Sequence, residues 1–226
     1  SKITDKTKAI VIINPNNPTG AQAPRGFLQR AIDLAHEYHF AIVQDFAYAG
    51  LGVDAQQISI LSLPGAFDVA VEVCSLSKMY AMAGWRAGFI AGNDDVVSHV
   101  KRYHYQMGSM VTSSIQDAGT VALLSDQSCV AELAERYASR REIVAGGLRE
   151  VGLDVFDSDG GIYAWVHAPE DQTGEQFADM LLERAAVAAL PGMCFGKVGK
   201  DYVRFSLLKS EDQLREAVRR VAAVLA

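Results

Sequence analysis

This chain of 226 residues has few cysteines, no long apolar run and no cluster of basic residues. Its three cysteines, Cys74, Cys129 and Cys194, are too few and too scattered for a disulfide framework or a zinc site, which favours a reducing compartment. No apolar run approaches the roughly 18 residues that a membrane span needs. No cluster of lysine and arginine stands out, and the formal charge is -6, which argues against a nucleic-acid footprint. We therefore expect a cytoplasmic protein without a metal, membrane or nucleic-acid partner.

Hydrophobic residues, by contrast, make up 50% of the chain, enough to bury a core in one large or two modest domains. Lys8–Ile13, Phe40–Gln44 and Val69–Cys74 are short apolar runs that predict strands, and apolar residues at helical spacing from Phe27 to about His39 predict a helix. Strands that are apolar throughout and separated by helices or long crossovers indicate a parallel sheet covered on both faces. The sequence therefore predicts an α/β fold.

The rest of the chain continues this alternation and then changes character. A strand at Arg86–Ala91 and a helix capped by Asp94 or Asp95 are expected, followed by two more helices. After Gly152 the pattern predicts a smaller α+β unit, so we expect domains at 1–145 and 146–226. The later elements are expected at Thr112–Leu124, Gln127–Val151, Val155–Phe156, Ile162–Val166, Gly174–Ala185, Val187–Leu190, Tyr202–Ser206 and Ser210–Leu225.

Polar residues follow the first three predicted strands. Asn17, Asp45 and the turn Ser75–Lys78 come after successive apolar runs. Ligands of parallel sheets bind beyond the carboxyl ends of the strands. We therefore expect these three polar sites to converge on one edge of the sheet.

The segment that contains Lys78 suggests a particular chemistry. A lysine amine can form a Schiff base with an aldehyde, while the hydroxyls of Ser75 and Ser77 and the fork of Arg86 can hold a phosphate. A cofactor with both groups would suit this stretch. On the residues alone, a buried strand followed by a polar turn with a surface lysine explains it about as well.

Asp45 and Tyr48 fit the same cofactor. A carboxylate at the end of a buried strand needs a cationic partner, and a protonated pyridine nitrogen would supply one. Tyr48 and Asn17 could each donate a hydrogen bond to a ring oxygen. Taken singly, Asp45 could equally be a helix cap or loop aspartate, and Tyr48 a core or rim tyrosine.

Together these motifs resemble the pyridoxal-phosphate-dependent aminotransferases of fold type I, class I/II, over essentially the whole chain. Asn14–Gly20 reads N-P-N-N-P-T-G and is similar to that family's N-P-x-N-P-T-G signature. Asp45 with Tyr48 resembles its D-x-x-Y pair, 28 positions after Asn17. Ser75–Lys78, with Arg86 eight positions after the lysine, resembles its cofactor-attachment motif. Tyr202–Ser206 resembles the stretch whose arginine binds a substrate carboxylate.

The resemblance implies roles for these residues. Lys78 would hold pyridoxal 5′-phosphate as an internal aldimine and shuttle a proton during transamination between an L-amino acid and a 2-oxoacid. Asn17, Asp45, Tyr48, Ser75, Ser77 and Arg86 would bind the cofactor. Arg204, with Asn17, would bind the substrate α-carboxylate. From residue type alone, Arg204 could instead be a strand arginine in a salt bridge.

The resemblance also leaves alternatives. An alanine-type donor is expected first, with an LL-diaminopimelate or an aspartate/aromatic aminotransferase as the alternative. A pyridoxal-phosphate-dependent carbon-sulfur lyase would use the same Lys78, Asp45 and Arg204, and a non-catalytic regulator could retain the fold.

The family's architecture completes the expectation: a three-layer sandwich as the large domain, incomplete here, with a smaller C-terminal domain, in a homodimer. A further N-terminal segment before Ser1 would carry the phosphate loop and the aromatic ring stacked on the cofactor. We therefore expect open sheet edges and exposed apolar surface, and little transamination by residues 1–226 alone.

Overall fold

The computed structural model of the chain describes residues 2–52, 57–108 and 110–225, and it divides into two compact units. The first comprises Ser1–Pro15 and Gln22–Leu133, and the second comprises Asn16–Ala21 and Ala134–Ala226. This division differs from the predicted domains at two places. It lies earlier, within the long helix α6 (Ser128–Glu150), and it groups the loop 16–21 with the second unit.

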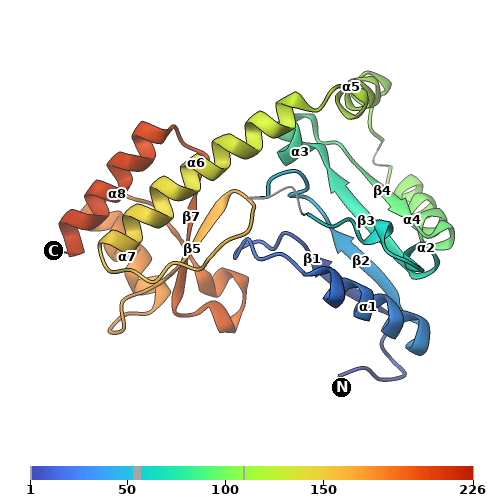
Figure 1. Cartoon of the computed structure of the whole chain (residues 1–226), viewed down its shortest axis with the longest axis horizontal. Coiled ribbons are helices and arrows are strands. Elements are labelled where there is room, and N and C mark those ends of the chain that lie inside the picture. Colours follow the sequence, from blue (N-terminus) through green and yellow to red (C-terminus); the bar gives the residue numbers. More distant parts are fainter. Residues whose placement is uncertain (1, 53–56, 109, 226) are drawn as a thin grey trace. The chain divides into compact units, whose positions relative to one another are not determined.

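The first unit is built on a sheet with the strand order β1-β2-β3-β4 in the described part of the chain (Figure 1). Its strands are β1 (Ala9–Ile13), β2 (Ala41–Asp45), β3 (Ala70–Ser75) and β4 (Gly88–Gly92). The first three run parallel, as predicted, whereas β4 is antiparallel to β3. The connection from β3 to β4 contains no long helix that could cross back over the sheet, so the chain returns beside β3 in the opposite direction.

Helix α1 (Arg25–Tyr38) illustrates how the sequence positions this sheet. Its buried residues recur at helical spacing and pack into the core with Phe40 and Ile42, and His39 ends the helix in a left-handed conformation (φ 54°). The other helices of this unit are α2 (Ala66–Val69), α3 (Leu76–Met79), α4 (Asp94–Gln106) and α5 (Ser113–Leu124), with 3-10 turns at Ile60–Ser62 and Ala83–Trp85.

The cap of α4 corrects one prediction. Asn93, rather than Asp94 or Asp95, is the N-cap, because its side-chain oxygen accepts the backbone N–H of Val96 at 3.1 Å. The two aspartates occupy the first turn instead, where their charge favours the positive end of the helix dipole.

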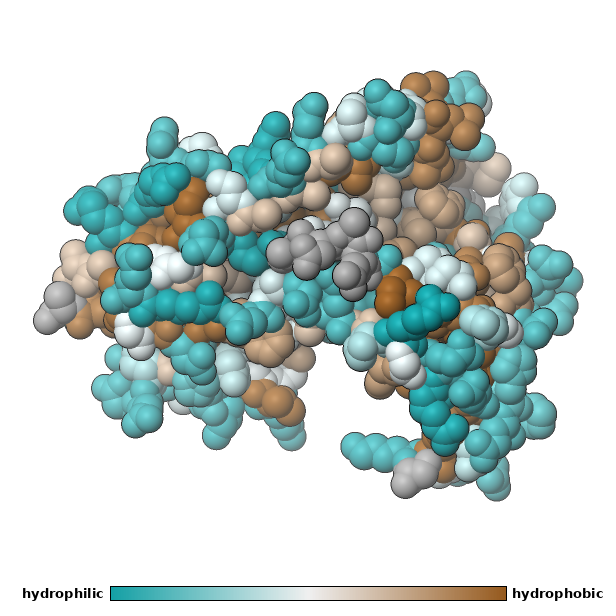
Figure 2. Space-filling view, viewed as in Figure 1, coloured by the Kyte–Doolittle hydropathy of each residue, from teal (hydrophilic) through white to brown (hydrophobic). Residues whose placement is uncertain are grey.

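The prediction that all strands are covered on both faces is wrong for β1. Val11 is 63% exposed, and Ile10 and Ile13 are also exposed, because Ile12 is the one residue of β1 that packs into the core formed with α1. Further apolar surface lies over α5, where Val121 and Leu124 are 67% and 82% exposed (Figure 2). The expected open edge and exposed apolar surface are therefore present in the first unit.

The second unit contains a smaller antiparallel sheet with the order β5-β7-β6. Helix α6 reaches into this unit, and its core includes the fully buried Leu148, Phe177, Leu181 and Leu207. The elements are β5 (Tyr163–His167), α7 (Gly174–Ala185), β6 (Leu190–Pro191), β7 (Tyr202–Ser206) and α8 (Glu211–Leu225), with 3-10 turns at Gly192–Phe195 and Lys197–Gly199.

Two predicted strands of this unit are largely absent. Val155 forms only an isolated bridge with Val166, and the strand expected at Val187–Leu190 is reduced to Leu190 and Pro191. Proline has no N–H to donate to the ladder, and Ala186 is left-handed (φ 52°), so the chain enters this segment from a sharp turn.

None of the helices that the described residues form is long and apolar enough to cross a membrane.

Candidate functional site

Lys78 lies in α3, a single helical turn that begins as soon as β3 ends. The turn is closed by Ser75, whose Oγ accepts the backbone N–H of Ser77 at 3.2 Å. The lysine is partly buried, and no carboxylate of the described chain forms an ion pair with it. Its amine is therefore not committed to a structural ion pair.

The start of β4 brings Arg86 close to the Lys78 turn. Gly88 pairs with Ser75 across the β3–β4 ladder, so Arg86, two residues earlier, lies near the Ser75–Lys78 turn. Only glycine fits at position 88, because an added Cβ would lie 2.5 Å from the carbonyl oxygen of Cys74. The exposed guanidinium of Arg86 uses Nη1 to bond the carbonyl of Ala83 at 3.1 Å. A guanidinium has five N–H donors, so others remain for an anion.

Asp45 ends β2 at the same edge of the sheet. It is paired with Val73 in the parallel ladder, two residues before Ser75. Its Oδ1 accepts the backbone N–H of Ala47 at 3.1 Å, and no lysine, arginine or histidine of the described residues pairs with it. Tyr48 follows in the next turn and is buried, with its carbonyl bonded to the side-chain amide of Gln57.

The negative charge of Asp45 affects the pKa of the neighbouring Cys74 thiol. Burial, together with the charges of Glu72 and Asp45, raises the pKa of the Cys74 thiol to about 11. Cys74 is thus neutral at ordinary pH and packs as a small apolar side chain with Phe46 and Ala49.

In the second unit, the structure brings Arg204 and Asn17 together. Nη1 of Arg204 donates to Oδ1 of Asn17 at 2.8 Å, which fixes the orientation of the Asn17 amide and points its NH2 group elsewhere. The guanidinium carbon lies 3.8 Å from the ring centroid of Tyr163 and 4.7 Å from that of Phe195. No carboxylate within the described ranges pairs with this cation. The predicted alternative of a structural salt bridge is therefore not what the structure contains.

The β-ladder explains this arrangement around Arg204. Trp165 of β5 is directly opposite Arg204, and Tyr163 and Trp165 share a face because side chains two apart on a strand point the same way. Trp165 stacks on Tyr202 at 5.1 Å and packs against the turn that carries Phe195. Arg204 is thus a rigidly held cation between aromatic faces, a suitable receptor for a carboxylate.

The sequence interpretation missed two of these neighbours. It singled out neither Tyr163 nor Phe195 as a neighbour of Arg204. The alternation of β5 could have placed Tyr163 beside Arg204, had the pairing of β5 with β7 been known. Phe195 lies in a 3-10 turn outside the strands and carries no such signal.

The predicted site residues are divided between the two units. Asp45 and the Ser75–Lys78 turn share one sheet edge, as expected, and Arg86 joins them. Asn17 does not belong to that unit and instead contacts Arg204. The cofactor and substrate roles of all of these residues stay predictions.

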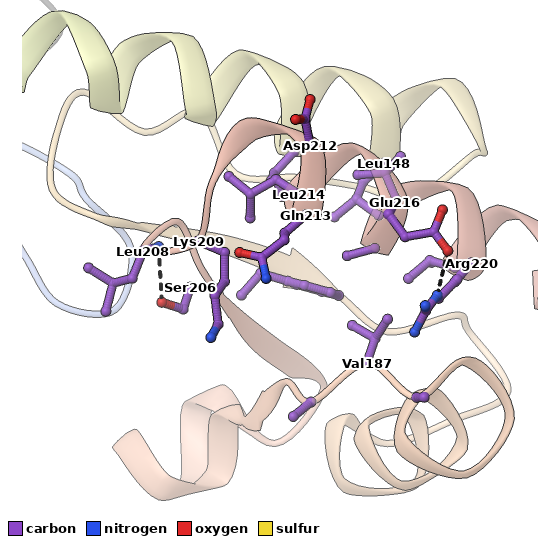
Figure 3. Close-up of a pocket in the computed structure, with 17 residues that line it drawn as sticks. Leu148, Val187, Ser206, Leu208, Lys209, Asp212, Gln213, Leu214, Glu216 and Arg220 are labelled. Atoms are coloured by element: carbon purple, nitrogen blue, oxygen red, sulfur yellow. Dashed lines mark hydrogen bonds and ion pairs between the residues drawn. The ribbon is translucent and has the colours of Figure 1, made fainter.

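A hollow of about 750 Å³ in the second unit is a different feature (Figure 3). Val187, Leu148 and Leu214 line it, and it includes Phe205, which alternates with Arg204 along β7 and so faces the other way. Its charged Glu216 is paired with Arg220 at 2.7 Å. Hydrogen bonds from Arg219 and Arg220 lower the pKa of Glu216 to about 2. This hollow does not include Arg204.

Within the described residues, no group of three or more histidine, cysteine, aspartate or glutamate side chains could hold a metal ion.

The chain resembles known proteins along nearly its whole length. A family described as aminotransferase class I and II matches residues 1–221. The chain is 42% identical to the L-glutamine--4-(methylsulfanyl)-2-oxobutanoate aminotransferase of Bacillus subtilis (strain 168), over 98% of this chain and 56% of that protein. It is 38% identical to the glutamate-pyruvate aminotransferase AlaC of Escherichia coli (strain K12), over 97% of this chain and 54% of that one.

A solved aminotransferase structure from Staphylococcus aureus superimposes with a TM-score of 0.93 at 36% identity, covering 98% of this chain and 59% of its own. The chain thus spans somewhat more than half the length of each of these relatives. With its family signature matched along nearly its whole length, the chain belongs to the class I and II aminotransferase family.

Proposed function

We propose that the protein transfers an amino group between an L-amino acid and a 2-oxoacid with the help of pyridoxal 5′-phosphate. One observation carries the proposal. Near one sheet edge lie a lysine and a carboxylate that form no ion pair with any described residue, together with two hydroxyls and an exposed arginine. Membership of the class I and II family, which is generally pyridoxal-phosphate-dependent, supports this interpretation.

The donor and acceptor groups fit this cofactor part by part. The Lys78 amine suits its aldehyde, and the Ser75 and Ser77 hydroxyls with Arg86 suit its phosphate. Asp45 suits the protonated ring nitrogen, because its carboxylate ends a core strand and no cation among the described residues pairs with it. Tyr48 and Asn17 keep the role of donors to the ring oxygen that the resemblance gave them.

When bound, the cofactor supplies an electron sink for the bond that breaks at the substrate α-carbon. The chain's own residues supply the rest. Lys78 accepts and returns a proton at Nζ, which requires the amine to be uncommitted to other partners. Arg204 binds the substrate carboxylate through its fork, and Asn17 holds that fork in orientation. The rings of Tyr163 and Phe195 lie beside the guanidinium of Arg204 and favour one orientation of it.

The amino donor is a separate proposal. An alanine-type donor with 2-oxoglutarate is our first choice from the sequence, with LL-diaminopimelate or an aspartate or aromatic amino acid as the alternative. L-Glutamine is a further candidate, because the relative of 42% identity is named for it. All of these donors share the α-carboxylate that Arg204 would bind, so the described residues favour the reaction type more strongly than the side chain.

A homodimer and a cytoplasmic location belong to the proposal as well. The relatives' family is generally dimeric, and the three cysteines of this chain are free thiols, as expected in a reducing compartment. Sedimentation of the full-length gene product would test the dimer, and a species of monomer mass at micromolar concentration would contradict it.

Assay of the full-length gene product tests the reaction. The purified protein is given the cofactor and each candidate donor with 2-oxoglutarate, and the products are identified by mass spectrometry. Formation of the new amino acid together with the 2-oxoacid of the donor supports transamination. Release of pyruvate and ammonia from cystathionine, without amino transfer, would support the carbon-sulfur lyase instead. Absence of both reactions would favour the non-catalytic regulator.

A further inference from the structure

The turn that carries Lys78 receives little support from regular structure. Helix α3 has only four residues, and the chain beyond it adopts left-handed conformations at Ala81 (φ 54°) and Arg86 (φ 52°), which cost energy for residues other than glycine. A segment of this kind depends on tertiary contacts to hold one orientation.

One such contact is a hydrogen bond from Tyr80, two residues after Lys78. Its hydroxyl donates to Oε1 of Gln127 at 2.6 Å. Gln127 lies just before α6, and its Nε2 donates to the carbonyls at the end of α5 and beyond it, those of Ala122 (3.0 Å), Leu123 (3.2 Å) and Ser125 (2.8 Å). Both ends of the amide are therefore engaged, and a flipped amide would set its oxygen against those carbonyl oxygens.

Packing also holds the Lys78 turn, against α5 and beside Gly50. Leu76 approaches α5 so closely that a Cβ on Gly119 would lie 2.8 Å from its Cδ1. Met79 packs beside Gly50, and a Cβ there would lie 2.7 Å from Val130 of α6. Helix α5 and Gln127 thus both contact the lysine turn, and Gln127 provides the directional contact.

We propose that Gln127 acts through Tyr80 as a positioning residue that sets the orientation of the Lys78 turn. The inference rests on the proposed function, since it assigns Lys78 the chemistry described above. Neither residue touches substrate by this account. Burial raises the pKa of Tyr80, with a smaller contribution from Cys129, so its hydroxyl stays protonated and able to donate over the working pH range.

The expected effect is moderate. Loss of one neutral hydrogen bond is worth about 0.5–1.5 kcal/mol, which corresponds to about a 2- to 12-fold loss. Because substrate binding by Arg204 is untouched, the loss is expected in kcat and not in KM. A misoriented lysine also changes the environment of its bond to the cofactor, which shifts the pH midpoint of the visible absorption band.

The test uses the full-length gene product loaded with pyridoxal phosphate, and compares Tyr80→Phe, Gln127→Ala, Gln127→Glu and the double variant Tyr80→Phe/Gln127→Ala. Gln127→Glu retains an acceptor for Tyr80 but places a carboxylate against the three carbonyls, so it is expected to resemble Gln127→Ala. The double variant is expected to be no worse than the Gln127→Ala variant, since both changes break the same contact.

Two matched controls separate positioning from loss of stability. Tyr103→Phe removes a hydroxyl from an exposed tyrosine of α4, and Gln176→Ala removes the capping-box glutamine of α7 in the second unit. Both should retain the wild-type kcat and pH midpoint. Melting temperatures are recorded for every variant.

The results separate failure of the proposed function from failure of the positioning role. If the wild-type protein shows no cofactor band and no turnover, the proposed function fails. If the wild type shows both, but Tyr80→Phe and Gln127→Ala leave kcat and the pH midpoint within error of Tyr103→Phe, the positioning role is overturned. A fall in kcat with a shifted midpoint in the two variants, absent from both controls, supports it.

Discussion

The two units hold Lys78 and Arg204 in contrasting ways. Lys78 of the first unit lies in one helical turn between two strands, with irregular backbone after it, and the hydrogen bond from Tyr80 to Gln127 lies two residues beyond it. Arg204 of the second unit stands within a paired strand, between two aromatic rings and an amide. Under the proposed function, the residue that would make and break bonds thus lies in the less regular backbone, whereas the residue that would only bind lies in a paired strand.

The contrast predicts that replacement of Lys78 has the largest effect. In Lys78→Ala, the amine that would attach the cofactor and carry the proton is absent, and kcat should fall by about 10²–10⁴-fold, the usual worth of a positioned proton-transfer group. Steady-state kinetics of the full-length protein checks this. Lys101→Ala, on the exposed surface of α4, is the matched control. Equal kcat values for the two variants would remove Lys78 from the mechanism.

Replacement of Arg204 should weaken binding of the amino donor and leave attachment of the cofactor to Lys78 intact. Arg204→Lys keeps the charge but loses the planar fork, its hydrogen bond to Asn17 and its stacking, so kcat/KM for the amino donor should fall by about 10- to 150-fold, the worth of a charge-assisted hydrogen bond.

The cofactor band should remain in this variant, which separates it from Lys78→Ala. Arg215→Lys, an exposed residue paired with Glu211, is the control and should behave as wild type. A lost band with unchanged donor kinetics would contradict the division of roles between the two units.

The aromatic faces around Arg204 sharpen the comparison further. Tyr163→Leu removes the ring that lies 3.8 Å from the guanidinium, and kcat/KM should fall by about 2- to 30-fold, as expected for a loss of 0.5–2 kcal/mol. Tyr163→Phe retains the ring face and should lose less. If the Phe variant is as impaired as the Leu variant, the hydroxyl of Tyr163 rather than its ring matters.

The smallest effect concerns the cysteines of the two units. The pKa of Cys74 is raised to about 11, so its thiol should react slowly with iodoacetamide at pH 8, whereas the exposed Cys194 should be labelled readily. In the unfolded chain the same thiol ionises near its ordinary pKa of about 8.5. The unfolded state therefore releases this proton first, and the free energy of unfolding should decline from about pH 8.5 to pH 11.

Peptide mass spectrometry after short labelling measures the thiol reactivity. Equal modification of Cys74 and Cys194 in the folded protein would show that Cys74 is not shielded as described.

Much of the fold followed from local patterns. The β-branched runs predicted β1, β2 and β3 and their parallel order, because such strands are apolar throughout, and Tyr202–Ser206 was predicted with its observed bounds. The polar residues at strand ends predicted the shared edge of Asp45 and Ser75 for the same reason. What failed depended on tertiary context: the exposure of β1, the short β6 and the cap at Asn93.

The candidate site shows the same limit. Residue type and spacing led to Lys78, Asp45 and Arg204, since each carries chemistry of its own. Tyr163 lies beside Arg204 across a β-ladder, and Gln127 is linked to the lysine turn by its hydrogen bond with Tyr80. No local pattern reports such contacts, so the structure was needed to find them.

The most direct test of the account is chemical trapping of the lysine. The full-length protein is incubated with pyridoxal phosphate, reduced with borohydride, digested and mapped by mass spectrometry. The account predicts one stable cofactor adduct, on the peptide that contains Lys78, and none on that peptide when an amino donor is added before reduction. Persistent labelling of another lysine, with Lys78 unmodified, would contradict it.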